Sequence, residues 1–319
     1  MKMRRFPDRR DTGTKGIIPV LIRDYLELTK PRVTWLILLS AAVGYYLGGG
    51  AGRYSVLFHT LLGTALLASG TAVLNEWYER EADARMHRTR RRPIPSGRIA
   101  PANALVFGLA LSLAGFGDLA LNVNWTAALR GLLTLACYLF LYTPLKRRTP
   151  HSSIVGAWAG AMPPVIGYAG AHGALTREAG ALFAILFLWQ FPHLLSIAWR
   201  HREDYGRAGI VFLPVVEPDG RSTARQMLIG SLLLIPVSLL PIYLSMEGWI
   251  YGGGALVLGL GYLFATLRVS MDRTAARARD VLLASVIYLP LLYGLMVVDH
   301  CRPFQPATSG EARVFAARY

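Results

Sequence analysis

The sequence is poor in cysteine and in charged residues, and these shortages limit what kind of protein it encodes. Its two cysteines, Cys137 and Cys301, lack the spacing of a metal site, so neither a disulfide framework nor a zinc site is expected. Charged residues make up 17% of the 319 residues, whereas hydrophobic residues make up 53%. One soluble core of this length could not use so much apolar surface, so the composition argues strongly against a soluble enzyme.

Long uncharged segments divide most of the chain into lengths that cross a membrane. Eight segments contain no Asp, Glu, Lys or Arg, and a ninth, residues 122–145, carries only Arg130 near its external end. Each is about long enough to cross ~30 Å of hydrocarbon as a helix, so the sequence predicts an all-α integral membrane protein with nine transmembrane helices. Prolines such as Pro163, Pro164 and Pro192 are expected to be tolerated inside these helices. The eight uncharged segments are residues 33–52, 54–75, 99–117, 149–176, 179–199, 226–246, 248–267 and 281–298.

The basic residues predict how the chain is oriented. Nearly all of the 34 lysines and arginines precede the first predicted helix or lie in alternate loops, which places the N-terminus in the cytoplasm and the C-terminus outside. The net charge of +15 therefore reflects topology, and no nucleic acid is expected as a partner. We expect a basic segment over residues 1–24 without a cleaved signal, a nine-helix domain over residues 25–300 and an external tail over residues 301–319. A bacterial cytoplasmic membrane is the expected location, with a mitochondrial inner membrane as the alternative.

Carboxylates are concentrated where the second predicted helix reaches the cytoplasm. If that helix continues, Asn75, Glu79 and Asp83 share one face at intervals of four residues, while Glu76 and Glu81 point elsewhere. Like charges at this spacing repel one another, so the face needs a cation. Carboxylate and amide oxygens suit Mg²⁺, which often shares its ligand shell with substrate phosphates.

Arginines follow this acidic face directly, and their planar groups match phosphate oxygens. Metal-binding carboxylates and phosphate-binding arginines beside an apolar bundle predict a substrate with a diphosphate head and a hydrophobic tail. The alternative is a solvated, salt-bridged helix end whose basic part contacts anionic lipid headgroups. The arginines are Arg88, Arg90, Arg91 and Arg92.

A second polar group is predicted around the sixth helix. Pro192 is expected to open the helix backbone so that Gln190 and His193 face the interior of the bundle. A core histidine with satisfied hydrogen bonds is an equally good interpretation of His193. Glu203 and Asp204 follow near the cytoplasmic surface, where they are expected to complete a second metal site opposite the first acidic face.

Two further expectations concern helix ends. Tyr142 and Lys146 end the fourth predicted helix on the cytoplasmic side, where the lysine either contacts phosphate or marks the membrane boundary. Asp118 is expected to pair with Arg130 across the external hairpin.

The first acidic face has the pattern of a known signature. Asn75-x3-Glu79-x3-Asp83, followed by Arg88-Thr89-x2-Arg92-Pro93, resembles the first motif of the UbiA superfamily of intramembrane prenyltransferases. Further segments, in matching order, are similar to one branch of that superfamily, the protohaem IX farnesyltransferases, and the similarity extends from about residue 24 to residue 298. These segments are Tyr25–Val33, Tyr142–Pro150, Ala161–Gly167, Trp189–His193, and Glu203–Tyr205 with Leu213–Val216.

The resemblance implies a UbiA-type bundle with a central cavity whose active site lies on the cytoplasmic side. It implies transfer of a farnesyl group from farnesyl diphosphate to a vinyl group of haem b. Water addition would then give haem O, the precursor of haem A, so a downstream haem A synthase would be a partner.

The resemblance also implies roles for single residues, carried over position by position. Mg²⁺ would be bound by Asn75, Glu79, Asp83 and Asp204, and Glu203 would share the second acidic motif with Asp204. The sequence departs from the family pattern at Glu79, which replaces the usual Asp, and at Arg91, where Asn is common; the first change puts only that ligand in doubt. The remaining assignments are Arg88, Arg92, Lys146 and Tyr142 at the diphosphate, and Gln190 and His193 on the haem side.

Three other functions stay open at this point. Another intramembrane prenyltransferase would keep the diphosphate chemistry and attach the chain to an aromatic acid or a quinone precursor. A transporter would place ionisable groups near the middle of the membrane, whereas here they gather at its cytoplasmic side. A haem-binding assembly factor would not need the acidic face that begins at Asn75.

Overall fold

The structure, a computed structural model, describes residues 14–300, and all regular elements in that range are helices joined by loops. The only pairing of extended backbone within it is an isolated bridge between Glu247 and His300. The all-α prediction is therefore confirmed for the described chain. The first helix, α1 (Thr14–Leu28), crosses the predicted domain boundary at residue 25, and the predicted tail at 301–319 lies outside the described residues.

Seven helical segments of the described chain are long and apolar enough to cross a membrane, so this is a multi-pass membrane protein. Two of the nine predicted spans fall short: α2 (Pro31–Leu47) has 17 residues, and the predicted fifth span is divided. The count of nine and the orientation therefore stay predictions. The seven segments are α3 (Tyr54–Tyr78), α5 (Pro101–Asn122), α6 with η1 and α7 (Trp125–Leu145), α10 (Arg177–Arg200), α13 with α14 (Arg221–Tyr243), α15 (Trp249–Met271) and α16 (Ala275–Val298).

Prolines act differently in the two places where they were expected inside a helix. The predicted fifth span is broken into α8 (Ser152–Gly160) and α9 (Pro163–His172), so the expectation that Pro163 and Pro164 lie within one helix was wrong. Proline has no N–H for the preceding turn but fits the first turn of a new helix, which explains why α9 begins there. By contrast, α10 continues through Pro192.

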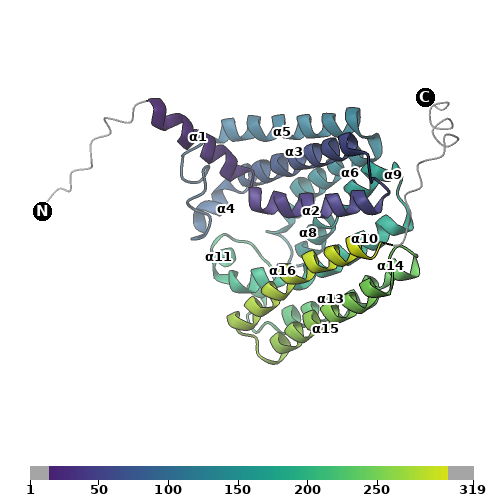
Figure 1. Ribbon diagram of the computed structural model, residues 1–319. Helices are drawn as coiled ribbons and strands as arrows, with labels where there is room; N and C mark the ends of the chain where they lie inside the picture. The colour runs from purple at the N-terminus through teal and green to yellow at the C-terminus, as the bar shows by residue number, and fades with distance from the viewer. Residues whose placement is uncertain (1–13, 301–319) are drawn as a thin grey trace, which may run out of the picture.

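The helices pack in two groups (Figure 1). In the first group α3 packs along α5 and α2 packs along α9, while in the second α10, α13, α15 and α16 pack together. The α2–α9 contact depends on two glycines, because an added Cβ would lie 2.0 Å from the Pro164 carbonyl oxygen at Gly44 and 1.8 Å from the Ala41 carbonyl oxygen at Gly167. Small residues of this kind let membrane helices approach closely.

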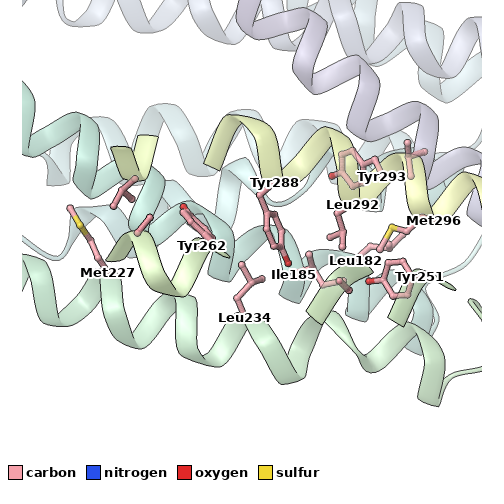
Figure 2. Packing of buried hydrophobic residues seen from close by; sticks show 14 of the residues in the cluster. Leu182, Ile185, Met227, Leu234, Tyr251, Tyr262, Tyr288, Leu292, Tyr293 and Met296 are labelled. Carbon is pink, nitrogen blue, oxygen red and sulfur yellow. The ribbon is translucent and has the colours of Figure 1, made fainter. Parts of the chain in front are cut away.

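Tyrosines fill the core of the second group (Figure 2). Tyr251, Tyr262 and Tyr288 are almost fully buried among aliphatic side chains. Two of their hydroxyls donate to backbone carbonyls, from Tyr251 to Ser238 at 2.6 Å and from Tyr262 to Trp189 at 3.2 Å. The second bond connects this core to the segment that carries Gln190 and His193.

Two short helices lie at the same end of the bundle (Figure 1). Helix α4 (Arg80–Arg85) follows α3, and α11 (Arg202–Arg207) follows α10. The chain after α11, including α12 (Leu213–Val216), is joined to the end of α7 (Thr143–Leu145) because the Val211 N–H donates to the Lys146 carbonyl oxygen at 2.8 Å. The predicted acidic and basic side chains therefore come together at this end.

Candidate active site

The predicted acidic face begins on α3 and continues into α4. Helix α3 ends at Tyr78, but the Asp83 N–H still donates to the Glu79 carbonyl oxygen at 2.8 Å, so the chain keeps a nearly helical path. Asn75 and Asp83 are both buried. The Asn75 side-chain amide donates to Glu79 Oε2 at 3.0 Å and to Thr143 Oγ1 at 3.1 Å. The structure thus brings Asn75 and Glu79 together as the spacing predicts.

Lys146 approaches Glu79 from the end of α7. Its Nζ lies 3.1 Å from both carboxylate oxygens of Glu79 and 4.4 Å from the ring centroid of Tyr142. Burial alone would lower the pKa of the Lys146 ammonium, but Glu79 and the hydroxyls of Tyr142 and Tyr138 together raise this pKa above its ordinary value. Lys146 therefore stays protonated and provides a fixed positive charge.

Arg92 joins two further carboxylates into one cluster. Its Nη1 lies 2.7 Å from Asp83 Oδ2 and its Nε lies 3.6 Å from Glu76 Oε1. Lys30 Nζ also reaches Glu76 Oε1, at 3.4 Å. Glu76 and Asp83 raise the pKa of the Arg92 guanidinium although burial opposes them, so this group also stays charged. The expectation that Glu76 points away from the acidic face was wrong, whereas Glu81 is exposed and pairs with its neighbour Arg80.

The two residues of the second acidic pair, Glu203 and Asp204, make different contacts. Asp204 on α11 accepts hydrogen bonds from the backbone N–H groups of His87 at 3.0 Å and Arg88 at 3.4 Å, and it forms an ion pair with Arg207. Burial would raise the pKa of Asp204, but these donors lower it below its ordinary value. Glu203 is exposed and borders a surface hollow that Asp204 and Arg207 border too, but it makes none of these contacts with the loop. Asp204 therefore holds the loop that carries the arginines.

Arg88 is the exposed member of the predicted diphosphate-binding set. Its Nη2 donates to the Tyr205 hydroxyl at 3.2 Å, and its guanidinium lies 5.6 Å from the Tyr205 ring centroid. Because Tyr205 follows Asp204 on α11, the same short helix fixes both the backbone and the side chain of Arg88.

Two apolar cavities lie behind the charged cluster. One, of about 170 Å³, is bordered by Lys30 and Tyr138, and the other, of about 310 Å³, is bordered by Tyr138, Tyr142, Gln190 and His193. Tyr138 therefore borders both cavities. Tyr138 and Tyr142 belong to a π-helical segment, η1 (Cys137–Tyr142), a form that often occurs at functional sites.

The predicted haem-side residues border the larger cavity. His193 Nδ1 lies 2.8 Å from Ser285 Oγ, and its ring stacks on Trp189 with centroids 4.5 Å apart. Trp189 Nε1 donates to the Ser285 carbonyl oxygen at 3.0 Å. Gln190 packs against Gly160, where an added Cβ would lie 2.3 Å from its Nε2. His193 is therefore both a hydrogen-bonded interior residue and a residue of the cavity wall.

Comparison with known proteins identifies the family of this chain. Residues 37–288 match the UbiA prenyltransferase family. The chain belongs to the UbiA prenyltransferase family. Two relatives named protoheme IX farnesyltransferase, from Solibacter usitatus and Koribacter versatilis, are 59% and 47% identical to it. The matches cover 87% and 88% of this chain and 99% and 94% of those relatives.

Solved structures show that the fold is that of the UbiA family. A structure described as digeranylgeranylglyceryl phosphate synthase in membranes superimposes with a TM-score of 0.74 at 17% identity, covering 88% of this chain and 98% of that chain. A UbiA homologue from Archaeoglobus fulgidus, bound to DMAPP and Mg²⁺, gives 0.62 at 20% identity, covering 86% and 99%. At these identities the likeness concerns the fold.

The donor set on α3 and α4 fits a magnesium ion that arrives with a diphosphate. Among residues 14–300, no three His, Cys, Asp or Glu side chains form a metal-binding group. Magnesium usually needs only one or two carboxylates, because waters and substrate phosphates complete its shell. Glu79 and Asp83 provide these, neither hydrogen bond of Asn75 described above uses its Oδ1, and Glu76 Oε2 is buried with no hydrogen-bond partner within the described chain.

Four residues of this UbiA-family site escaped the sequence analysis. Glu76 had a usable signal, because it lies seven residues before Asp83, almost two full helical turns, and so on nearly the same side. Lys30 stands directly before the first predicted helix, yet only the fold brings it to Glu76. Thr143 and Tyr138 showed no pattern that separates them from ordinary residues of a helix end.

Proposed function

We propose that this chain transfers a farnesyl group from farnesyl diphosphate to a vinyl group of haem b, forming haem O and diphosphate. The observation that carries the proposal is the meeting of a buried cluster of carboxylates and cations with two adjoining apolar cavities. Such a site suits a substrate with an anionic head and a long apolar chain. The choice of farnesyl and haem rests on the relatives named protoheme IX farnesyltransferase.

The diphosphate would bind where carboxylates and cations already compensate one another. Lys146 and Arg92 each neutralise a carboxylate in the free protein. When magnesium and diphosphate arrive together, Glu79 and Asp83 would turn to the metal while both cations turn to phosphate oxygens. Arg88 and Lys30 would add donors at the edge of the site. The metal would supply Lewis-acid stabilisation of the leaving diphosphate.

The reaction begins when the bond between farnesyl C1 and the diphosphate oxygen breaks, and the electron pair leaves with the diphosphate. Lys146, Arg92 and Arg88 would stabilise the charge that develops there. The π electrons of the vinyl group then form the new C–C bond to the allylic cation. Water adds to the cation left beside the macrocycle and loses one proton, which gives a hydroxyethylfarnesyl group. The aromatic faces of Tyr138 and Tyr142, which border the larger cavity, would stabilise the cation.

Haem b would lie in the larger cavity against Gln190 and His193. Leu36 and Val286 also border this cavity and are about half exposed, 50% and 49%, so it opens toward lipid between α2 and α16. A macrocycle larger than 310 Å³ would therefore extend through this opening toward the bilayer. His193 and Gln190 would orient the ring so that one vinyl group faces Tyr138.

The location and the limits of the domain belong to the same proposal. The charged cluster would lie on the cytoplasmic side of a bacterial cytoplasmic membrane, as the distribution of basic residues predicts. Residues 25–300 would form the prenyltransferase domain. A haem A synthase would consume the product.

The product of the reaction tests the proposal. Membranes that contain this protein are incubated with Mg²⁺, farnesyl diphosphate and haem b, with and without an added phenolic acid, and the extracts are analysed by mass spectrometry. We expect a haem whose mass has increased by one farnesyl group and one hydroxyl group, and none in membranes without the protein. Transfer to the phenolic acid alone would overturn the haem assignment and keep the diphosphate chemistry. No transfer to either acceptor by folded protein would overturn the proposed function.

A further inference from the structure

A large hollow lies far from the charged cluster, toward the opposite end of the bundle. Its volume is about 520 Å³, larger than either cavity at the candidate active site. This groove is bordered by Leu129, Arg130 and Leu133 of α6, by the first two turns of α10 and by the break between α8 and α9. Because α6 begins at the end of the bundle opposite Lys146, this hollow has no part in the chemistry proposed above.

The walls of this groove are apolar and face the lipid. Leu129 and Leu133 on α6 are about half exposed, and Trp158 and Phe183 form the opposite side with ring centroids 6.3 Å apart. Gly180 leaves the groove open, because an added Cβ at this position would meet no atom within 4 Å. The shape and lining fit an extended hydrocarbon chain.

Arg130 borders the groove and has no anionic partner among the described residues. Arg130 is half buried and donates a hydrogen bond to the Thr126 carbonyl oxygen of its own helix at 3.2 Å. The expected pairing of Asp118 with Arg130 was wrong, because Asp118 binds His59 at 2.8 Å and Asn122 at 2.9 Å. Within residues 14–300, no carboxylate forms an ion pair with Arg130. A guanidinium has five N–H donors, so most of its capacity is left for an external partner.

We infer that this groove binds an anionic phospholipid, with the phosphate on Arg130 and an acyl chain between Leu133 and Phe183. Three observations support this assignment. The Arg130 guanidinium has no ion-pair partner within the described residues, an apolar groove lies beside it, and the groove is on the surface of membrane-spanning helices. A phosphodiester provides the acceptor oxygens that a planar guanidinium binds in pairs. The site is independent of the proposed transferase activity.

Lipid titration followed by native mass spectrometry tests the inference. The full-length protein is delipidated in detergent and titrated with phosphatidylglycerol or phosphatidylcholine, and the occupancy of the first bound lipid is measured. We expect wild type to bind phosphatidylglycerol more tightly. Arg130→Gln should weaken phosphatidylglycerol binding about fivefold and remove the difference between the two lipids, because one basic residue near a membrane surface contributes about this much.

Filling the groove provides a second variant with a matched control. Gly180→Leu should weaken binding of both lipids, because its side chain occupies the space of the acyl chain. Gly261→Leu should leave binding unchanged, since Gly261 on α15 also has open space at its Cβ but lies outside the groove. A thermal unfolding measurement checks that each variant is folded.

Three outcomes would overturn the inference. Equal affinity of wild type for the two lipids would show that the groove does not select an anionic headgroup. Unchanged binding of phosphatidylglycerol by folded Arg130→Gln protein would show that Arg130 does not bind the phosphate. Arg177 is an exposed arginine at the same end of the bundle but outside the groove lining. If Arg177→Gln weakened phosphatidylglycerol binding as much as Arg130→Gln, the binding would reflect surface charge in general and not this groove.

Discussion

The two acidic segments of this protein look alike in sequence and differ in structure. At the end of α3 and in the segment after it, Glu76, Glu79 and Asp83 are each paired with a cation from another part of the chain. In the segment that follows α10, Asp204 binds two backbone amides and Arg207 from its own helix, while Glu203 is exposed.

This difference separates two uses of a carboxylate. Ion pairs between long side chains of different elements can exchange partners when a metal ion and a diphosphate arrive, because both members can rotate. A carboxylate that caps backbone N–H groups cannot leave them without exposing unsatisfied donors. The first set is therefore suited to binding ligands, and Asp204 is suited to positioning Arg88. Substitutions on each side of this comparison should have different consequences.

The largest effect is expected for Asp83→Asn. It removes the charge that holds Arg92 and, in the proposed site, a ligand of the metal, so kcat/KM for farnesyl transfer should fall about 100- to 1000-fold, the scale of losing one preorganised electrostatic contact. The rate is measured against Mg²⁺ concentration. Glu81→Gln is the matched control, because this neighbouring carboxylate is 71% exposed and should be dispensable. A loss below about fivefold in Asp83→Asn would contradict the assignment of the first set to the diphosphate.

A smaller loss is expected for Lys146→Gln. The change removes a cation that would bind phosphate, and it leaves Glu79 without its partner. Loss of a charge-assisted contact of about 1.5–3 kcal/mol corresponds to a decrease of about 10- to 150-fold in kcat/KM. Inhibition by added diphosphate should weaken in parallel. The exposed neighbour offers the control, since Arg147→Gln should change neither quantity. Unaltered diphosphate inhibition in Lys146→Gln would leave this lysine with a structural role only.

The sequence predicted the features that depend on local periodicity. The lengths of the uncharged segments predicted the membrane helices. The spacing of four residues predicted that Asn75 lies beside Glu79. Both predictions follow from the geometry of a single helix. Partners from distant elements were not predictable in this way. Asp118 was expected to pair with Arg130 and binds His59 instead, since the packing of α3 against α5 decides which side chain is within reach.

The second acidic segment shows the same limit. The order Glu203-Asp204 suggested two equivalent carboxylates, but their directions on a short helix differ, and only Asp204 points to the loop that contains His87. The break at Pro163 was also missed, because sequence alone does not decide whether neighbouring helices compensate for the missing N–H.

Asp204→Ala should act mainly on local stability. It leaves the N–H groups of His87 and Arg88 without their acceptor, which costs about 1–3 kcal/mol. Hydrogen exchange of residues 84–92 should become faster, with only a small change in the rate of transfer. Asp219→Ala is the control, because this exposed aspartate also accepts a backbone N–H bond, from Arg221 at 3.2 Å. Unchanged exchange in Asp204→Ala would show that this carboxylate does not hold the loop.

The pH dependence of this effect has a definite sign. Hydrogen bonds and Arg207 lower the pKa of Asp204 in the folded protein, so its contribution is fully present above the pKa of the unfolded state, about 3.9. The contribution is lost as the pH falls through the lowered folded pKa. The difference in hydrogen exchange between wild type and Asp204→Ala should therefore be constant near neutral pH and should shrink below about pH 4.

The smallest effect is expected for Glu203→Gln. Its side chain is exposed near Trp199 and Arg273, and the hydrogen bonds to the arginine loop are made by Asp204 instead. If the two segments differ as the contacts suggest, this change alters kcat/KM by about twofold or less, the scale of an exposed ion pair. The same Mg²⁺ titration that is used for Asp83→Asn provides the measurement. A loss as large as that of Asp83→Asn, with a raised requirement for Mg²⁺, would mean that α11 turns on ligand binding and that Glu203 becomes a metal ligand only in the loaded enzyme.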